Sequence, residues 1–412
     1  MVRKDIQLYK FSAYGFLKNL RFFDPFIILF FREMGISFLQ IGVLFSVREI
    51  STMILEIPTG IVADSFGRKN SMIFSFLSYI VSFLIFFLFP NYAMYVLAMI
   101  LYAFGEAFRT GTHKAMILEY LRLKNIEHLK VDYYGFTRSW SQKGSAVSSL
   151  IAGAIVFYSG QYKYIFVASV IPYILELFLM ISYPKELNGS ITKFDERNYF
   201  KNILLSFRKT ALNFLSIFKN PTLLKAFSNS AVFDGLFKTV KDYIQPVMKS
   251  FALSLPVFFF FKDKRDTVLI AVVYFILYLL TSTASKNAGK FKRKCKSLVS
   301  AINTTYLVGV LIIVFAGLFY FLDWKIIAII FFVLLFVIQN LRRPLNVGYL
   351  SEIIPRKVMA SGLSAESQIK TFFVAIFAPI MGFLADKFGI GPGLMILSFL
   401  VLAVYPIVKL KK

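Results

Sequence analysis

The sequence predicts an all-α membrane protein with twelve transmembrane helices arranged in two pseudo-symmetric six-helix bundles. The 412 residues are 58% apolar, and the mean hydropathy of +0.68 is far above that of soluble domains. Apolar runs of the length that crosses a bilayer recur along the whole chain, separated by short polar segments. The net charge of +25 lies mostly in these loops, so it indicates membrane topology rather than nucleic-acid binding.

Each predicted span is an apolar run bounded by charged residues, prolines or glycines. In chain order the spans cover residues 7–31, 37–59, 70–89, 92–118, 134–158, 163–183, 221–250, 267–285, 297–321, 324–350, 358–386 and 389–408. Lysine and arginine are concentrated in alternate loops, which places those loops and both termini in the cytoplasm. The loops predicted to lie outside hold Arg32, Lys163, Lys262, Lys264, Arg265, Lys325 and Lys387. We therefore expect a multi-pass protein of the cell inner membrane.

A charged stretch divides the chain into two halves. Residues 1–184 are predicted to form the N-terminal bundle and residues 221–412 the C-terminal bundle. Between them, residues 185–220 interleave charges with Phe and Leu, which is typical of an amphipathic cytoplasmic linker on the membrane surface. The halves resemble each other weakly, as expected for a transporter built from two related bundles.

A short polar motif lies between the second and third spans. It contains Gly60, Asp64, Gly67, Arg68 and Lys69. Glycines allow two helices to approach closely, and the charges can form a network where the helices meet water. The motif is therefore predicted to act as an inner gate.

A near-copy of this motif, from Gly382 to Gly389 with Asp386 between them, follows the eleventh span. The predicted topology places this copy on the outer face. It is therefore not expected to form the same gate.

The first motif matches in full the Gly-x-x-x-Asp-x-x-Gly-Arg-Lys signature of the major facilitator superfamily, which this chain resembles over nearly its whole length. The resemblance implies the twelve-helix fold of secondary transporters, alternating access and no cofactor. It also implies that Asp64 faces the start of the eleventh helix near residues 359–361. Arg68 and Lys69 would then bind inner acids such as Glu119 or linker carboxylates. The segments 56–60 and 105–112 are similar to bacterial efflux permeases, which implies proton antiport.

Ionisable residues recur inside the spans, where each charge costs on the order of 3 kcal/mol. In the family fold, the first, fourth, seventh and tenth helices line the central cavity, and these spans carry polar stripes. Such stripes place charges on one helical face at i, i+3, i+4 and i+7 spacing. The candidates for proton coupling or the substrate cavity are Asp24, Glu106, Arg109, His113, Asp234, Lys238, Asn340 and Arg343.

The carboxylates of this set have two interpretations. Asp24, Glu106 or Asp234 could carry the coupled proton, because burial favours the protonated form while a nearby cation favours the ionised form. Alternatively, Glu106 with Arg109, and Asp234 with Lys238, are neutral pairs within one helix that only make insertion tolerable. Among these cavity candidates the cations, Lys238 and the arginines, outnumber the acids. This surplus of positive charge suits an anionic or zwitterionic solute.

Other charges in the spans are predicted to hold the bundles together. Arg48, Arg138, Glu366 and Lys370 are interpreted as inter-bundle salt-bridge residues, the last two as i, i+4 partners. Arg48 and its neighbour Glu49 point to different helical faces, which argues against a pair. His113 could relay protons, but its position beside Lys114 favours a solvated side chain, and Glu176 has no evident partner.

Several function classes lack their motifs. The sequence has no phosphate-binding loop and no nucleophile elbow, and one cysteine and two histidines offer little for a metal site. We therefore expect neither an enzyme nor a cofactor. The first hypothesis is proton-coupled efflux of a small organic solute by a monomer in the bilayer. The alternatives are an uptake permease or uncoupled facilitator for an anionic or zwitterionic metabolite, and a non-transporting sensor or scaffold.

Overall fold

The computed structural model describes residues 5–110, 112–188, 205, 221–254, 265–354 and 359–411. These residues form helices joined by short turns and contain no strand. By their contacts the chain divides into two compact units. The first unit comprises Met1–Asp24 and Ile50–Phe207, and the second comprises Pro25–Glu49 and Arg208–Lys412. Contacts thus assign Pro25–Glu49 to the second unit, although this segment lies in the N-terminal half of the sequence.

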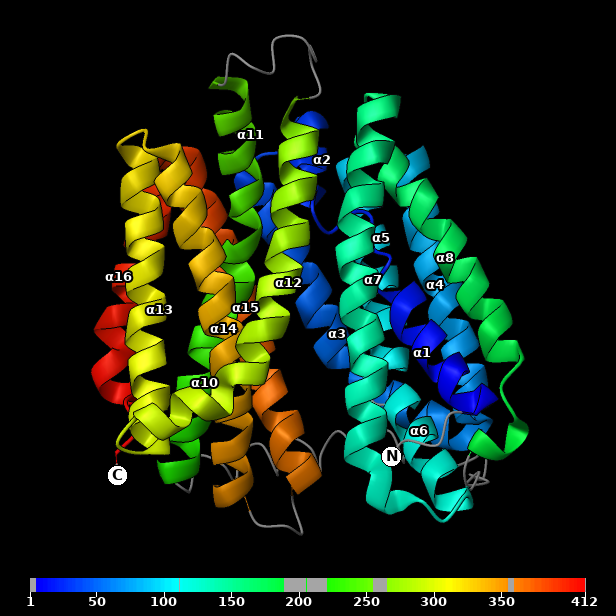
Figure 1. The fold of residues 1–412 in the computed structure, drawn as a ribbon. Helices are drawn as coiled ribbons and strands as arrows, with labels where there is room; N and C mark the ends of the chain where they lie inside the picture. The colour runs from blue at the N-terminus through cyan, green and yellow to red at the C-terminus, as the bar shows by residue number, and fades with distance from the viewer. Residues whose placement is uncertain are drawn as a thin grey trace. The chain divides into compact units, whose positions relative to one another are not determined.

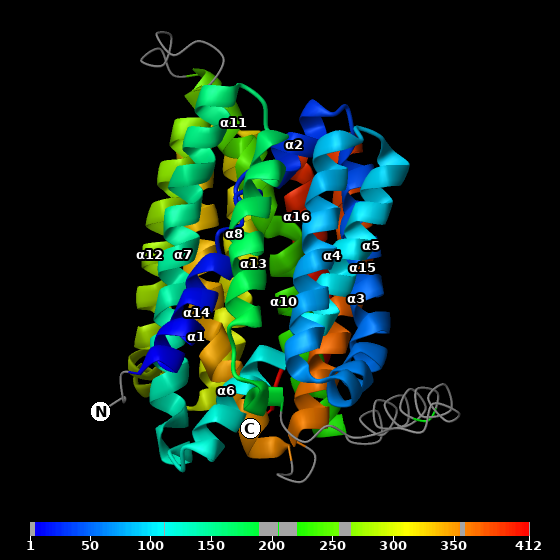
Figure 2. The same ribbon diagram turned by 90° about the vertical axis from the view of Figure 1, so that its right-hand side faces the viewer.

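The first unit is built from helices of the N-terminal half, and it includes the part of α3 that begins at Ile50. Its elements are α1 (Ile6–Lys18), α4 (Arg68–Leu88), α5 (Tyr92–Arg109), α6 (Thr112–Leu123), η1 (Glu127–Leu129), α7 (Lys130–Ser159), α8 (Tyr164–Ile181) and η2 (Lys185–Asn188). α1 lies beside α7, and α4 lies beside α5 (Figures 1 and 2). α4 and α5 carry the candidate site, together with the segment that follows α1.

The second unit contains the remaining helices. Its elements are α2 (Ile27–Glu33), the first part of α3 (Phe38–Phe66), α10 (Pro221–Val240), η4 (Lys241–Tyr243), α11 (Ile244–Ser254), α12 (Arg265–Lys294), α13 (Leu298–Phe321), α14 (Lys325–Ile353), α15 (Met359–Phe388) and α16 (Ile390–Val408). α10 packs against α15, and α13 packs against both α14 and α16. Figure 1 shows α13 and α14 side by side.

A stripe of serines joins α4 to α5. The hydroxyl groups of Ser75, Ser78 and Ser82 donate to backbone carbonyls of Gly105, Leu101 and Ala98, at 2.6, 2.6 and 2.7 Å. Small residues permit this close approach, and each polar group is satisfied without water. The stripe fixes the register between the two helices and hence the position of the polar residues at the end of α5.

A buried arginine joins three helices of the second unit. Arg342 of α14 is fully buried, and it donates to Asn229 of α10 and to Ile302 and Thr305 of α13. Its guanidinium also lies 4.8 Å from the ring centroid of Phe233. The planar fork of arginine suits several acceptors at once, so this side chain acts as a structural cross-link.

Three predicted spans are interrupted. The span predicted at 7–31 is interrupted between Lys18, where α1 ends, and Ile27, where α2 begins; within this stretch Pro25 disfavours helical backbone at Asp24. The span at 92–118 breaks after α5, where Thr110 has extended backbone, and α6 continues to Leu123. The span at 221–250 is divided by η4 between α10 and α11. All three spans carry polar candidate residues near their breaks.

The predicted polar turn at 60–69 is mostly helix. α3 continues to Phe66, and only Gly67, with φ of +91°, separates it from α4. Such a backbone conformation favours glycine. Eight helical stretches of the described residues have the length and apolar composition of a membrane crossing. They are Phe38–Glu56, Arg68–Leu88, Tyr164–Ile181, Asp266–Lys294, Leu298–Phe321, Lys325–Ile353, Ala365–Phe388 and Ile390–Val408.

Candidate functional site

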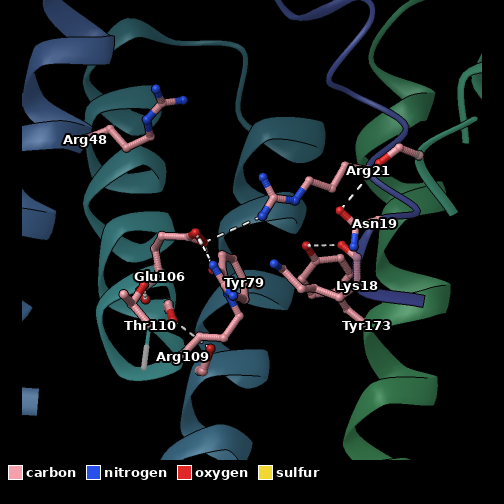
Figure 3. Close-up of polar contacts among 12 residues, drawn as sticks. Lys18, Asn19, Arg21, Arg48, Tyr79, Glu106, Arg109, Thr110 and Tyr173 are labelled. Atoms are coloured by element: carbon pink, nitrogen blue, oxygen red, sulfur yellow. Dashed lines mark hydrogen bonds and ion pairs between the residues drawn. The ribbon is translucent and has the colours of Figure 1, made fainter. Parts of the chain in front are cut away.

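A polar cluster lies inside the first unit around Glu106 of α5. The carboxylate of Glu106 accepts from the hydroxyl of Tyr79 on α4 and pairs with Arg109 one turn further along α5. Arg21, in the turn after α1, approaches the same carboxylate, with Nη2 3.8 Å from Oε2. Figure 3 shows Arg21, Tyr79 and Arg109 directed toward Glu106. The pair Glu106–Arg109 was expected, whereas Tyr79 and Arg21 were not.

Local structure positions these side chains. The backbone carbonyl of Glu106 accepts from the amide and hydroxyl of Thr110, at 2.9 and 2.8 Å. These two hydrogen bonds stabilise the last turn of α5. Asn19 closes the end of α1 by donating to the carbonyl of Gly15 at 2.7 Å. The break after Lys18 turns the chain away from the helix axis and presents Arg21. A charged residue at a helix break was detectable in the sequence, but no sequence signal distinguished Tyr79 from the other buried aromatic residues.

The cluster carries more positive than negative charge. Among the described residues, Lys18, Arg21 and Arg109 interact electrostatically with Glu106. The side chains of Arg21, Arg109 and Glu106 are 20%, 13% and 25% exposed. Tyr173 of α8 donates to the carbonyl of Lys18 at 3.4 Å (Figure 3). A partly exposed group of cations around one carboxylate can bind an anion while the carboxylate exchanges a proton.

His113 was expected to be solvated, and that expectation was wrong. The residue is 8% exposed and stacks on Tyr14, with ring centroids 3.5 Å apart. Its Nε2 lies 3.1 Å from the hydroxyl of Tyr183. α5 ends before Thr110 and a new helix begins at Thr112, so helical spacing along the predicted span does not give the direction of His113.

Two further acids of the first unit occupy different environments. Asp24 lies in the turn before α2 and interacts electrostatically with Arg21. Glu176 of α8, for which the sequence offers no partner, is fully buried and interacts electrostatically with Lys18. Of the three predicted carboxylates, Glu106 is thus the one that the described contacts place at the centre of a cation cluster.

The pairing of Asp234 with Lys238, one of the two interpretations of these residues, was wrong. Asp234 instead accepts from Gln339 of α14 at 2.9 Å. Lys238 pairs with Glu49 of α3 at 2.9 Å, and Arg48 also reaches Glu49 at 2.9 Å. Neighbouring residues can share a partner when a long arginine side chain curls back, so the argument against Arg48 and Glu49 as partners was also wrong. Glu49 was missed because its partner lies nearly two hundred residues away in the sequence.

The remaining candidates make separate contacts. Asn340 donates to the backbone of Phe336 at 2.9 Å, and Arg343 is exposed. Arg138 is exposed on α7. Glu366 accepts from Ser230 at 2.8 Å and interacts electrostatically with its predicted partner Lys370.

The basic half of the inner-gate motif anchors α4. Arg68 pairs with Glu119 of α6 at 3.7 Å, as expected. No acid among the described residues pairs with Lys69. Its ammonium instead donates to the carbonyls of Ile181 and Tyr183, and its amide donates to the side chain of Asn188 at 2.8 Å. Gly60 and Asp64 lie in α3, but their side chains, and the predicted contact of Asp64 near residues 359–361, lie outside the described residues.

Histidine and cysteine, which commonly bind metal ions in proteins, are rare in this chain. Within the described ranges, no group of three or more His, Cys, Asp or Glu side chains is arranged to hold a metal ion. Most of the linker, residues 189–204 and 206–220, lies outside those ranges, so its predicted amphipathic helix stays a prediction.

The comparisons with known proteins agree with this architecture. An uncharacterized MFS-type transporter, YxaM of Bacillus subtilis (strain 168), is 22% identical over 98% of this chain and 93% of its own length. The solved nucleoside transporter NupG superposes with a TM-score of 0.77 over 99% of this chain and 100% of its own, at 12% identity. A D-xylose-proton symporter superposes with a TM-score of 0.68 over 98% of this chain and 97% of its own, at 17% identity.

At these identities the solved structures establish the fold alone. The family model of the Major Facilitator Superfamily, in contrast, matches residues 14–367, which is most of the chain. The protein therefore belongs to the major facilitator superfamily and is a multi-pass secondary transporter of a small molecule.

Proposed function

We propose that this protein couples the export of a small organic solute to proton movement by alternating access. The observation that carries the proposal is Glu106, a membrane-embedded carboxylate bound by Arg109, Arg21 and Tyr79. Such a carboxylate can exchange a proton for a bound solute, because both change its interaction with the same cations. The same fold occurs in a D-xylose-proton symporter, so proton-coupled transport is compatible with it.

The surplus of cations indicates the solute's chemistry. An anionic or zwitterionic solute would place its negative group between Arg21 and Arg109 when Glu106 is protonated. Arginine binds carboxylates and phosphates through two parallel hydrogen bonds, which favours such a ligand over a lipophilic cation. The same surplus favours the second candidate function, proton-coupled uptake of an anionic or zwitterionic metabolite.

The direction of export rests on the likeness of segments 56–60 and 105–112 to efflux permeases. The charge bias of the loops supports an orientation with both termini in the cytoplasm of an inner membrane. We further propose that the protein works as a monomer, since each bundle can bury its polar residues within itself. Asp64 is proposed to latch the cytoplasmic side against the start of α15, where a helix N-terminus attracts a carboxylate.

A binding panel tests the function and separates the two candidates. Purified protein is titrated, at alkaline and at mildly acidic pH, with amino acids, mono- and dicarboxylates, nucleosides, sugars and lipophilic cations. We expect ligands with a negative group to bind, with an affinity that changes with pH in the natural protein and not in Glu106→Gln. Selective, pH-independent binding of lipophilic cations would contradict the proposal.

The direction is then tested with the ligand that the panel identifies. Right-side-out and inside-out vesicles are placed in a solution of that ligand, with the acidic side of the proton gradient at the outer face of the protein in both. Export predicts accumulation in inside-out vesicles, whereas uptake predicts accumulation in right-side-out vesicles. Equal movement in both, without response to the gradient, would indicate an uncoupled facilitator.

A further inference from the structure

Glu176 of α8 is a buried acid that the proposed function does not use. It is fully buried, and none of the described side chains donates a hydrogen bond to either of its carboxyl oxygens. An ionised carboxylate in such a position is costly, whereas a protonated carboxyl group is neutral and costs far less. The surroundings of Glu176 therefore favour a carboxyl group that holds a proton.

Lys18 lies between Glu176 and the candidate site. Its ammonium interacts electrostatically with Glu176 on α8 and with Glu106 on α5, and among the described residues it forms an ion pair with neither. Tyr173, one turn before Glu176, donates to the carbonyl of Lys18 and so holds this end of α1 against α8. Figure 3 shows the side chain of Lys18 directed toward the residues of α5. Lys18 is thus within electrostatic reach of both acids.

His113 and Tyr183 form a hydrogen-bonded pair near Glu176. Tyr183 interacts electrostatically with Glu176, and so does Tyr14, which stacks on the imidazole. The hydroxyl of Tyr183 donates to the carbonyl of Lys10 at 3.3 Å, so its oxygen can accept from Nε2 of His113 at 3.1 Å. Nδ1 is then the ring nitrogen that can take up a proton. An imidazole that accepts a proton at one nitrogen and releases one from the other can carry protons.

The His113–Tyr183 pair lies close to the surface of the first unit. Lys114 and Ser182, which adjoin the pair in sequence, are exposed. Lys69 of the inner-gate motif donates to the carbonyl of Tyr183 at 2.9 Å. The pair therefore lies at the end of the unit that carries this motif, which is the end proposed to face the cytoplasm.

The charged groups that act on Glu176 are cations. Lys18 of α1 and Arg109 of α5 interact with it electrostatically. α4 and α7 also pack against α8. α4 presents aromatic rings there, and the described cations of α7, Arg138 and Lys143, are exposed. A proton that leaves Glu176 would therefore leave a carboxylate beside two cations, which stabilise its charge for the time of a transfer.

We propose that protons reach Glu106 through the interior of the first unit, by way of the His113–Tyr183 pair, Glu176 and Lys18. The ammonium of Lys18 gives a proton to Glu106, and Glu176 returns a proton to the amine that remains. His113 then replaces the proton of Glu176 and takes up another from water. The sum is one proton moved from water to Glu106. Glu176 is a relay residue in this scheme, whereas Glu106 exchanges its proton for the solute, so the proposal rests on the proton-coupled function above.

Infrared spectroscopy tests the buried proton without a solute. A protonated carboxylic acid has a carbonyl stretching band that an ionised carboxylate lacks, and the band shifts when deuterium replaces the proton. The full-length protein in lipid nanodiscs is transferred from light to heavy water at neutral pH, where exposed carboxylates are ionised. The shifted band reveals the protonated acid, and the rate of the shift measures proton exchange with the solvent.

The variants assign the band and the route. We expect the natural protein to show the band and Glu176→Gln to lack it. Glu352→Gln, which changes an exposed carboxylate of α14, should keep it. His113→Gln retains a donor for Tyr183 but carries no proton, so it should keep the band and exchange at least about tenfold more slowly, since a positioned proton carrier typically contributes more than this. Lys114→Gln, at the exposed neighbouring position, should exchange at the natural rate.

The step from Lys18 to Glu106 is tested with the carboxylates of the binding panel. Mono- and dicarboxylates are added to proteoliposomes that contain a pH-sensitive dye. Lys18→Arg keeps the positive charge, but a guanidinium does not give up its proton. We therefore expect Lys18→Arg and Glu176→Gln to bind the carboxylates that the natural protein binds, and to slow the accompanying proton movement at least about tenfold.

The outcomes separate the parts of the relay. A band that persists in Glu176→Gln would overturn the buried proton, and natural exchange in His113→Gln would overturn the route through the pair. Unslowed proton movement in Lys18→Arg would overturn the last step. Gel filtration and thermal unfolding establish that each variant is folded. The expected infrared results without solute-driven proton movement would contradict the proposed function and keep the buried proton site, whereas proton movement without the Glu176 band would contradict this inference alone.

Discussion

At the scale of single residues, Glu106 owes its importance to the groups around it. Replacing it with glutamine keeps the shape but leaves Arg109 and Arg21 without their carboxylate. We expect Glu106→Gln to bind solute independently of pH and to lose at least about tenfold in uphill accumulation, because the coupled charge is gone. Accumulation of a radiolabelled panel ligand under an imposed proton gradient measures the effect.

Tyr79→Phe is the matched control for this variant. It removes the hydroxyl that donates to Glu106 but preserves the ionisable group. Accumulation should fall less than in Glu106→Gln and should still depend on the gradient. Undiminished gradient-driven accumulation by Glu106→Gln would show that another group carries the proton.

Arg342 makes a prediction about stability at the same scale. Arg342→Lys leaves several of the acceptors on Asn229, Ile302 and Thr305 unsatisfied in a fully buried position. We expect a loss of about 3 kcal/mol of stability, since each buried group without a partner costs about 1–3 kcal/mol. Thermal unfolding in detergent should show a lower midpoint. Arg343→Lys, at the exposed neighbouring position, should leave the midpoint unchanged.

Residue-level predictions from sequence succeeded where the partner is local. Glu106 and Arg109 are one helical turn apart, so their contact could be predicted from spacing. Lys238 was assigned to Asp234 by the same rule, but its partner Glu49 comes from a distant helix. His113 was misplaced because its orientation depends on a helix break that local spacing does not reveal.

At the scale of helices, Gly42 makes a prediction. Gly42→Ala adds a methyl group to α3 that overlaps the backbone of α15, so the two helices must move apart where they touch. We expect a loss of about 1–3 kcal/mol of stability, the usual range for overpacking. Gly348→Ala on α14, where a methyl group would meet nothing within 4 Å, should be neutral or slightly stabilising. Equal unfolding midpoints for the two variants would contradict the close packing.

Helix positions were predictable because apolar runs reveal bilayer crossings, and α13 at Leu298–Phe321 lies within one residue of its prediction. Helix breaks were less predictable. Pro25 signalled the break before α2, but the division of α10 from α11 by η4 follows from tertiary packing. α3 extends through the predicted motif to Phe66, and the glycine with positive φ, Gly67, comes directly after it.

At the scale of the whole molecule, the proposed cytoplasmic latch makes a prediction. Asp64→Asn should weaken this latch and shift the population toward the inward-open state. A thiol probe in the cytoplasmic gate should therefore become severalfold more accessible in this variant. Unchanged accessibility in Asp64→Asn, together with unchanged transport, would count against the cytoplasmic latch.

The overall architecture was predictable because hydropathy, loop charge and one motif are independent signals that agree. The assignment of Pro25–Glu49 to the second unit was not, because it depends on contacts such as those of Gly42 and Asp386 across hundreds of residues. The charged residues that couple these helices could be listed from sequence, but their pairing required the fold.

The most direct test of the central claim is proton movement driven by solute. The natural protein and Glu106→Gln are reconstituted in proteoliposomes that contain a pH-sensitive dye, and each solute of the panel is added without an imposed gradient. We predict that at least one solute with a negative group changes the internal pH through the natural protein and not through the variant. Solute movement with no accompanying proton movement, or the same proton movement in both proteins, would contradict the account.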